Sequence, residues 1–239
     1  MPSLLRAARV TTGRRVLDVA TGTGEAAIAA ILLVGPAGAV IGADISAAMV
    51  GAARDRLPQC YRAVVTDGER LAFRDAAFDA VVCQLGLMFF PDPAQGLAEF
   101  RRVLRGGGRA AVCVISKSER APMWGVLTES LSRHLPDRRE VLNLSFSLAD
   151  PEQLERMFTA AGFQEVGVTR ETRHGVVGSF DEFWAAIEAG TGQQPLIYLG
   201  LPEHERQAVR EEVRVALSPF GSNGRLEMSV EMLIGVGRA

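Results

Sequence analysis

A glycine-rich stretch near the start of the chain has the residue types of a nucleotide-binding loop. Residues 16–28 read VLDVATGTGEAAI. Within them, Gly22, Gly24 and Ala27 fit the G-x-G-x-x-G/A pattern of dinucleotide sites, in which glycines let the backbone approach the ligand closely. Asp44 follows Gly24 by twenty residues, where such sites place a ribose-binding carboxylate. On this pattern alone, NAD is a candidate ligand.

The charges around the loop argue against a pyrophosphate. Backbone N–H groups and the positive end of a helix dipole hold a pyrophosphate, and nearby carboxylates oppose that binding. Here Asp18 ends the first predicted strand and Glu25 opens the next helix. Asp44 and Asp67 end the second and third predicted strands. This acidic edge favours a ligand that has a ribose and a cationic part but no phosphate, such as S-adenosylmethionine.

Five ordered blocks make the chain resemble the class I S-adenosylmethionine-dependent methyltransferases, in particular the small-molecule branch that includes the quinone-biosynthesis C-methyltransferases. The blocks are VLDVATGTG (16–24), VIGADISAAMV (40–50), TDGERLAFRDAAFDAVV (66–82), CQLGLMFFPD (83–92) and EFRRVLRGGGRAAV (99–112). A single glycine motif is weak support for such a family, whereas five blocks in this order and spacing are strong support. The resemblance covers about residues 14–116, weakens toward the C-terminus, and implies an enzyme that transfers methyl groups.

The resemblance also implies a set of cofactor-binding residues. Asp18, the glycine loop and the backbone after the fourth strand would surround the methionine part of S-adenosylmethionine, and Asp44 would accept both ribose hydroxyls. Ile45 and Met49 would line the adenine slot, with the loop after the third strand near the adenine amino group. The full predicted set is Asp18, Ala20, Gly22, Thr23, Gly24, Asp44, Ile45, Met49, Asp67, Gly68, Glu69, Gln84 and Leu85.

Composition favours one α/β domain and excludes several classes of partner. The 239 residues are 48% hydrophobic and 23% charged, which suits one substantial core. The formal charge is −2, without a basic run, so neither nucleic acid nor an anionic membrane is an expected partner. Cys60, Cys83 and Cys113 lack metal-ligand spacing, so we expect neither disulfides nor a metal site. Without a secretory signal or an apolar run long enough to span a bilayer, the protein is predicted to be cytoplasmic.

Continuous apolar runs alternate with helical patterns from residue 15 to residue 116. Strands that are buried on both faces have such runs, so the pattern predicts a parallel sheet with helices on both sides. We expect a Rossmann-like α/β fold with seven strands, mostly parallel, and an antiparallel last strand. The predicted single domain has a cofactor-binding core (14–116), two helical cap insertions (117–149 and 179–223) and two segments that complete the sheet (150–178 and 224–239). The insertions would cover the carboxyl edge of the sheet, where open α/β folds bind ligands.

Helix boundaries are marked by capping residues. Asp92 and Asp150, each followed by a proline, predict helix starts, and Ser179 begins a capping-box pattern. Gly106 and Gly162 stand where the first two of these helices should end.

The acceptor side of the site is less constrained by the sequence. Methyl transfer is an in-line displacement at a sulfonium with a neutral leaving group, so the protein must mainly position the acceptor and exclude water. An acidic acceptor would gain about 10² to 10⁴ in rate from a general base. His174, followed by His134, is the candidate base, with a solvated surface histidine as the alternative for each. Four aromatic side chains of the insertions could line an apolar acceptor pocket or instead pack a core: Trp124, Phe183, Trp184 and Tyr198.

The short N-terminal segment raises the question of what covers the cofactor. Members of the family usually have some tens of helical residues before the first motif, whereas Met1 to Arg14 precede the first strand here. We expect the cover to come from the insertions, from the partner subunit of a homodimer, or from a segment missing at the start.

Two other functions stay open at this point: a non-catalytic S-adenosylmethionine-binding or scaffold protein, and an NAD-dependent oxidoreductase. An arsenic methyltransferase is disfavoured because Cys83 and Cys113 lie inside predicted strands. A nucleic-acid amino-methyltransferase is disfavoured because QLGL (84–87) replaces its Asn/Asp-Pro-Pro-aromatic motif.

Overall fold

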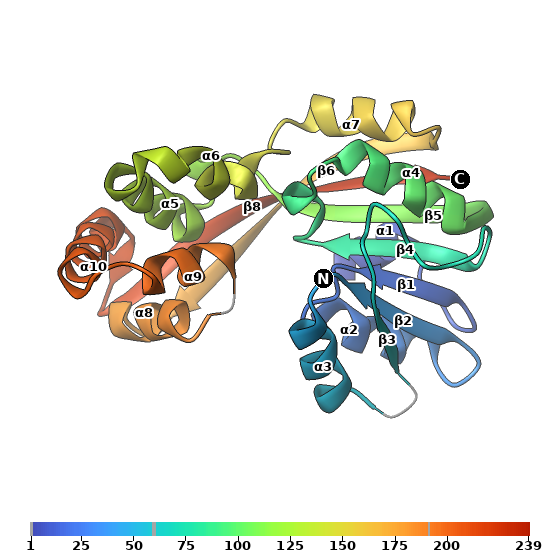
Figure 1. Cartoon of the computed structure of the whole chain (residues 1–239), viewed down its shortest axis with the longest axis horizontal. Helices are drawn as coiled ribbons and strands as arrows, with labels where there is room; N and C mark the ends of the chain where they lie inside the picture. The colour runs from blue at the N-terminus through green and yellow to red at the C-terminus, as the bar shows by residue number, and fades with distance from the viewer. Residues whose placement is uncertain (1, 59–60, 191) are drawn as a thin grey trace. The chain divides into compact units, whose positions relative to one another are not determined.

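The computed structural model describes residues 2–58, 61–190 and 192–239 (Figure 1). Cys60, for which we expect neither a disulfide nor a metal, lies outside the described residues. The chain divides into two compact units, each formed by segments that are distant in the sequence. The first unit consists of Met1–Val114, Leu148–Arg170 and Leu233–Ala239, and the second consists of Ile115–Ser147 and Glu171–Met232.

An open sheet forms the centre of the first unit. Its spatial order is β3-β2-β1-β4-β5-β8-β6. β1 pairs in parallel with β2 and with β4, β2 pairs with β3, and β4 pairs with β5. The strand bounds are β1 (Arg15–Val19), β2 (Ala39–Asp44), β3 (Arg62–Val65), β4 (Phe78–Gln84), β5 (Leu104–Ile115), β6 (Gln164–Val177) and β8 (Arg225–Arg238). The last two strands are long enough to contribute residues to both units.

The last strand, β8, runs antiparallel to β5. Ala239 N donates to Gly108 O (2.9 Å) near the start of β5, and Ser116 N donates to Glu231 O (3.1 Å) just past its end. Rising numbers on one strand therefore pair with falling numbers on the other. The predicted Rossmann-like sheet of seven mostly parallel strands is confirmed, and the two-residue β7 (Gly221–Ser222) is an additional strand that pairs with β8.

Helices cover both faces of this sheet. α2 (Glu25–Val34) packs on β1 and β2, and α3 (Ala47–Arg56) packs on β2 and β3. Right-handed crossovers between these strands put both helices on one face. The chain then returns to β4 beside β1, so α4 (Pro93–Val103) lies on the other face, where it packs against α7 (Pro151–Ala160) (Figure 1). This unit also contains α1 (Pro2–Ala7) and the 3-10 turn η1 (Leu87–Phe89).

The capping signals located the helix starts correctly. Asp92 accepts hydrogen bonds from the first turn of α4, and Asp150 does the same for α7. Ser179 caps α8 (Phe180–Glu188). Gly106 does not end α4, because the helix stops at Val103 and β5 begins at once. Instead of a glycine cap, there is a hydrogen bond from Gly107 N to Ala239 O at the C-terminus (2.8 Å).

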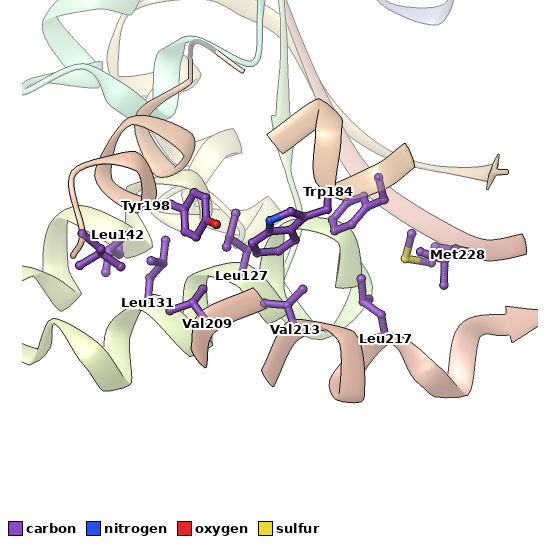
Figure 2. Close-up of a cluster of buried hydrophobic side chains, with 12 residues drawn as sticks. Leu127, Leu131, Leu142, Trp184, Tyr198, Val209, Val213, Leu217 and Met228 are labelled. Atoms are coloured by element: carbon purple, nitrogen blue, oxygen red, sulfur yellow. The ribbon is translucent and has the colours of Figure 1, made fainter. Parts of the chain in front are cut away.

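The second unit is mostly helical and has its own core (Figure 2). α5 packs against α10, and buried side chains from these helices meet residues of α8, α9 and β8. Trp184 is 1% exposed, and its ring meets that of Tyr198 edge to face, with centroids 5.1 Å apart. Its elements besides α8 are η2 (Ser118–Arg120), α5 (Pro122–His134), η3 (Pro136–Arg138), α6 (Arg139–Leu142), η4 (Asn143–Phe146), α9 (Gln193–Leu199), α10 (Glu203–Leu217) and η5 (Ser218–Phe220).

Helix length bears on membrane insertion. The longest described helix, α10, has 15 residues, which is shorter than the roughly 20 apolar residues that a bilayer-spanning helix needs. Among the residues that the structure describes, no helix combines the length and the apolar character required to cross a membrane.

Candidate functional site

Asp44, the last residue of β2, ties the glycine loop to the neighbouring strand. Its Oδ2 accepts a hydrogen bond from Gly22 N (2.9 Å), and its Oδ1 accepts one from Ser46 N (2.9 Å). Ser46 in turn caps α3 by accepting from Met49 N (3.3 Å). Each carboxylate oxygen has a second lone pair. Asp44 can therefore hold the loop and still accept two hydrogen bonds from a ligand.

Two strained residues lie where β1 and β4 end side by side. Ala20 and Leu85 both have φ of 53°, a conformation that residues with a side chain rarely adopt. They follow a register in which Val19 faces Cys83, and a side chain at Gly86 would overlap the Ala20 methyl group. Such strain costs of order 1–3 kcal/mol per residue and tends to cluster at ligand sites. The conformation of these two residues therefore lowers stability and is typical of a ligand site.

The glycine loop leaves space beside this strained backbone. Gly22 has a φ of 53°, and a β-carbon added there would meet no atom within 4 Å. Gly24, the next glycine, has a φ of 88° and its added β-carbon would overlap Leu57. The first glycine therefore leaves room for a ligand, and the second allows the loop to pack against the end of α3.

Two buried oxygen atoms next to the loop have no hydrogen-bond partner. They are Oδ1 of Asp18 on β1 and Oε1 of Gln84 at the end of β4. Burial raises the pKa of Asp18 from its ordinary value near 4 to about 7, even though interactions with the Thr21 hydroxyl and the Ala27 backbone oppose the change. Buried acceptors are seldom left unpaired in folded proteins, because each lost hydrogen bond costs about 1–3 kcal/mol. Two such acceptors on neighbouring strands are suited to a cationic or hydrogen-bonding ligand.

Apolar side chains are exposed at the ends of β2 and β3. Ile45 is 72% exposed and Val65 is 54% exposed, and the register pairs Val65 with Asp44, the neighbour of Ile45. Met49, on the first turn of α3, is half-buried. Isolated exposed apolar residues are common, but two of this size beside a ribose-type carboxylate can form one wall for a flat ring.

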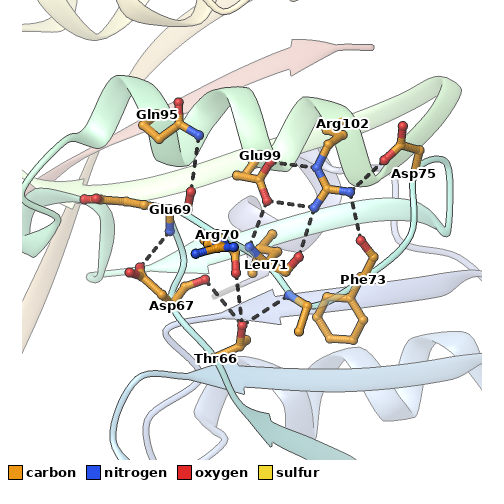
Figure 3. A network of polar contacts seen from close by, with 11 residues as sticks. Thr66, Asp67, Glu69, Arg70, Leu71, Phe73, Asp75, Gln95, Glu99 and Arg102 are labelled. Carbon is orange, nitrogen blue, oxygen red and sulfur yellow. Dashed lines mark hydrogen bonds and ion pairs between the residues drawn. The ribbon is translucent and has the colours of Figure 1, made fainter.

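The loop after β3 is held by a polar network centred on Arg102 of α4 (Figure 3). The Arg102 guanidinium donates to Glu99 (2.6 and 2.7 Å) and to Asp75 (2.7 Å), and to the carbonyls of Leu71 (2.9 Å) and Phe73 (2.8 Å). Glu99 also accepts from Leu71 N (2.8 Å). Because one planar guanidinium satisfies several acceptors at once, this network fixes the path of the loop.

The predicted residues of this loop differ in how free they are. Asp67 is exposed, and its Oδ1 accepts from Glu69 N (2.9 Å). The Glu69 carboxylate accepts from Asp92 N (2.6 Å), so it joins the loop to the start of α4. A side chain at Gly68 would overlap the ring of Phe90. Asp67 is therefore the member of the set that has a carboxylate oxygen free for a ligand.

The acidic character of the loop is weaker than the sequence suggested. Glu25 forms an ion pair with Arg56 of α3, and the same guanidinium lies 3.4 Å from the hydroxyl of Thr23. The Glu25 charge is thereby neutralised locally. Asp44 and Asp67 carry the negative charge that the argument against a pyrophosphate requires.

Comparisons with known proteins decide which family uses this arrangement. The family model described as "Methyltransferase domain" matches residues 17–112. A demethylmenaquinone methyltransferase of Corynebacterium kroppenstedtii is 36% identical over 166 residues, which are 65% of this chain and 70% of that protein. The ubiquinone/menaquinone biosynthesis C-methyltransferase UbiE of Pseudomonas fluorescens is also 36% identical, over 66% of this chain and 68% of its own. The chain belongs to the class I S-adenosylmethionine-dependent methyltransferases.

The fold comparison agrees with this assignment. A Bacillus halodurans C-125 protein of known structure superposes with a TM-score of 0.63 at 21% identity, covering 99% of this chain and 97% of its own. The methyltransferase therefore uses S-adenosylmethionine, and the choice that the glycine pattern left open between this cofactor and NAD is settled by the family. The residues fit that cofactor, because unpaired acceptors suit its ammonium group and the open space at Gly22 suits a close ligand.

The candidate bases of the methyltransferase lie in the second unit. His134 Nε2 contacts Glu212 Oε1 (3.0 Å) between α5 and α10. Burial opposes ionisation of Glu212, but hydrogen bonds that include the one from His134 lower its pKa to about 2. His174, on β6, is bonded through Nδ1 to Ser229 Oγ (2.8 Å). His134 is bonded to a carboxylate between two helices, which suits a structural role, whereas His174 is exposed and is bonded to a neutral hydroxyl.

The candidate aromatic residues of the acceptor pocket also lie in the second unit. Phe183, Trp184 and Tyr198 are at most 4% exposed and form part of the core drawn in Figure 2. Trp124, on α5, is half-buried. Packing against other apolar side chains explains the first three, and a role for any of the four at the acceptor stays a prediction.

Replacing Arg102 with alanine is expected to lower the free energy of unfolding of the first unit by about 1–2 kcal/mol, the lower part of the range for hydrogen bonds to a charged group. The side chain is 32% exposed, so solvent screens part of its interaction energy. Lysine should restore the charge but not the planar set of donors. Urea unfolding followed by circular dichroism measures the change. Arg74, an exposed arginine of the same loop, is the control, and an equal loss in Arg74→Ala would contradict the role of the network.

Proposed function

We propose that this methyltransferase acts on a small, apolar or aromatic acceptor, with a quinone- or quinol-type ring as the leading case. The observation that carries the proposal is the 36% identity to a demethylmenaquinone methyltransferase across 70% of that relative. The acceptor atom, whether carbon, oxygen or nitrogen, is part of what the experiment below must determine.

The proposed cofactor site uses the carboxyl ends of β1 to β4. Asp44 would accept the ribose hydroxyls, since each of its oxygens has a lone pair in excess of its backbone contacts. The unpaired oxygens of Asp18 and Gln84 would face the ammonium end of the cofactor. Ile45 would supply the exposed apolar wall for the adenine, and Asp67 would accept from its amino group. Met49 would also line the adenine slot. The other predicted residues would contribute backbone beside the cofactor: Ala20, Gly22, Thr23, Gly24, Gly68, Glu69 and Leu85.

Positioning is the main contribution that these residues would make to the reaction. When bound, S-adenosylmethionine supplies a methyl group on a sulfonium and leaves as neutral S-adenosylhomocysteine. The strained backbone at Ala20 and Leu85 is already formed, so little of it must be ordered when ligands bind. Of the two candidate bases, we favour His174 for an acidic acceptor, because its imidazole is bonded to a neutral hydroxyl whereas that of His134 is bonded to a carboxylate.

A labelled-methyl assay tests the proposed acceptor class. The protein is incubated with S-[methyl-³H]adenosylmethionine and a panel of quinols, phenols and amines, and the extracted products are counted. Label in the quinols or phenols supports the proposal, provided that control reactions without protein stay at background. Label confined to the amines would replace the proposed class by an N-methyl acceptor. His174→Gln should lower the rate with quinols while S-adenosylhomocysteine affinity, measured by calorimetry, stays unchanged.

We also propose that the enzyme works in the cytoplasm without a nucleic-acid or membrane partner. Cys83 is a free thiol, which suits a reducing compartment. The net charge of −2 offers no basic surface for anionic polymers. A homodimer that covers the cofactor is the remaining partner we propose, and sedimentation with and without S-adenosylhomocysteine measures it.

A further inference from the structure

A chain of buried hydroxyl groups leads from the start of β3 to Asp18. Tyr61, the residue before β3, has its hydroxyl 3.0 Å from Thr21 Oγ1. Thr21 Oγ1 donates to Asp18 Oδ2 (2.7 Å). Because a threonine hydroxyl has one hydrogen and gives it to Asp18, the Tyr61 hydroxyl is the donor to Thr21. The direction is therefore Tyr61 to Thr21 to Asp18.

The sequence provides room for this chain across β2. Tyr61 precedes β3 and Asp18 lies in β1, so the contact must pass the strand between them. Gly42 of β2 makes this possible, since a β-carbon there would overlap the Tyr61 hydroxyl. Tyr61 and Thr21 are 5% and 6% exposed. A glycine inside a strand often marks such a close approach.

The surroundings of Asp18 decide how its charge behaves. The charged and titratable groups that face it are Asp44 on β2, Tyr61 before β3 and Cys83 on β4, with Arg54 of α3 near the Tyr61 hydroxyl. None of them is a cation in contact with the carboxylate. The hydroxyl chain satisfies Oδ2, and Oδ1 has no partner.

We propose that Tyr61 is a positioning residue which, through Thr21, orients Asp18 toward the cofactor's ammonium group, and that cofactor binding releases a proton from Asp18 to solvent. The proposal rests on the cofactor site described under Proposed function. With burial raising the pKa of Asp18 to about 7, the carboxyl is about half protonated in the empty protein at neutral pH. An incoming ammonium group stabilises the carboxylate, so the proton leaves to buffer. Tyr61 strengthens the Thr21 donor and thereby favours the same charged form.

Calorimetric titration with S-adenosylhomocysteine between pH 6 and pH 7.5 tests the proposal. Affinity of the unaltered protein should rise about five- to tenfold over this range, because the proton competes with the ligand for the charged form. At pH 7, titrations in buffers of different ionisation heat should give about half a proton released per ligand bound. Asp18→Asn removes this release, and what remains is the titration of the ligand's own groups.

Tyr61→Phe separates positioning from packing, because it keeps the ring and removes only the hydroxyl. We expect affinity at pH 7 to fall about three- to tenfold, as for one hydrogen bond, and the pH midpoint of binding to move upward. Thr21→Val should act in the same direction, and Thr21→Ser should restore the profile. Thr128→Val, which removes a buried hydroxyl of the second unit, should leave the midpoint unchanged.

The outcomes distinguish failure of this inference from failure of the cofactor site. If Asp18→Asn binds S-adenosylhomocysteine as tightly as the unaltered protein, Asp18 does not face the ligand and the proposed site is wrong. If Asp18 matters for affinity but the pH profile is flat, or Tyr61→Phe leaves the midpoint in place while its melting temperature is preserved, the site stands and the proton-linked positioning is overturned.

Discussion

Replacing Asp44 with alanine is expected to weaken S-adenosylhomocysteine binding by roughly 10- to 150-fold, the equivalent of about 1.5–3 kcal/mol for hydrogen bonds to a charged group. Two ribose hydroxyls lose their proposed acceptor. Gly22 N and Ser46 N lose theirs as well, so the loop is less well ordered before binding. Isothermal titration calorimetry measures the change. Asp55→Ala, which removes an exposed carboxylate of α3, is the matched control and should bind normally.

A ligand analogue separates the ribose contact from the loop contact. S-adenosylhomocysteine without its two ribose hydroxyls should bind the unaltered protein far more weakly, but should bind Asp44→Ala almost as well as the complete ligand does. This cycle isolates the coupling between the carboxylate and the hydroxyls. If the analogue loses the same factor in both proteins, Asp44 acts through the loop alone and the ribose assignment fails.

The order of the sheet could be predicted because it follows from local patterns. Continuous apolar runs gave the parallel strands, and the glycine loop between the first strand and the first helix gave the crossover and the carboxyl edge. Capping residues such as Asp92 and Ser179 depend on their own backbone neighbours, so their positions were also correct. The prediction that Gly106 ends a helix was wrong, because its surroundings are set by a strand more than a hundred residues later in the chain.

The electrostatics of the site could not be predicted, because they depend on pairs that are distant in the sequence. Glu25 looked like a free carboxylate, yet Arg56 on the next helix neutralises it. The contact of Tyr61 with Thr21 spans 40 residues and was missed. One signal was available, since Gly42 interrupts an otherwise apolar strand and such a glycine indicates that another group approaches the backbone.

The aromatic residues of the insertions show a different limit. Hydrophobic spacing on a helix predicts a buried face but not what covers it. Trp184 and Tyr198 satisfy that spacing by packing on each other and on α5 and α10. An apolar pocket lined by the same residues would have given the same pattern, so sequence alone left the two possibilities equal.

Replacing Asp18 with asparagine is expected to stabilise the empty protein at pH 8 while it weakens cofactor binding. A carboxyl with a pKa of about 7 when folded and near 4 when unfolded binds its proton more tightly in the folded state. The free energy of unfolding therefore falls as the pH rises from 4 to 7, and the full cost is present above pH 7. Three pKa units correspond to at most about 4 kcal/mol, and asparagine, still a buried polar group, should recover about 1–3 kcal/mol of it.

The effect of Asp18→Asn should depend on pH, and a second buried carboxylate, Asp79, provides a control of opposite sign. At pH 5.5 the unfolded carboxyl has ionised while the folded one is still mostly neutral, so only about half of the full cost is present and Asp18→Asn should stabilise about half as much as at pH 8. Asp79 is the opposite case, since its buried carboxylate accepts from Arg14 (2.9 Å) and from Arg15 N (2.7 Å). Asp79→Asn should therefore destabilise at pH 8, because an ion pair is lost rather than an unpaired charge removed.

The measurement must report on the first unit. Both tryptophans, Trp124 and Trp184, lie in the second unit, so intrinsic tryptophan fluorescence follows that unit and not the sheet around Asp18. Hydrogen exchange of the β1 amides gives the required local free energy at each pH. A gain in protection in Asp18→Asn at pH 8, and about half of that gain at pH 5.5, is the expected result. Equal or reduced protection at pH 8 would mean that the charge on Asp18 is already compensated in the empty protein. Its unpaired oxygen would then not be a binding position for a cationic group.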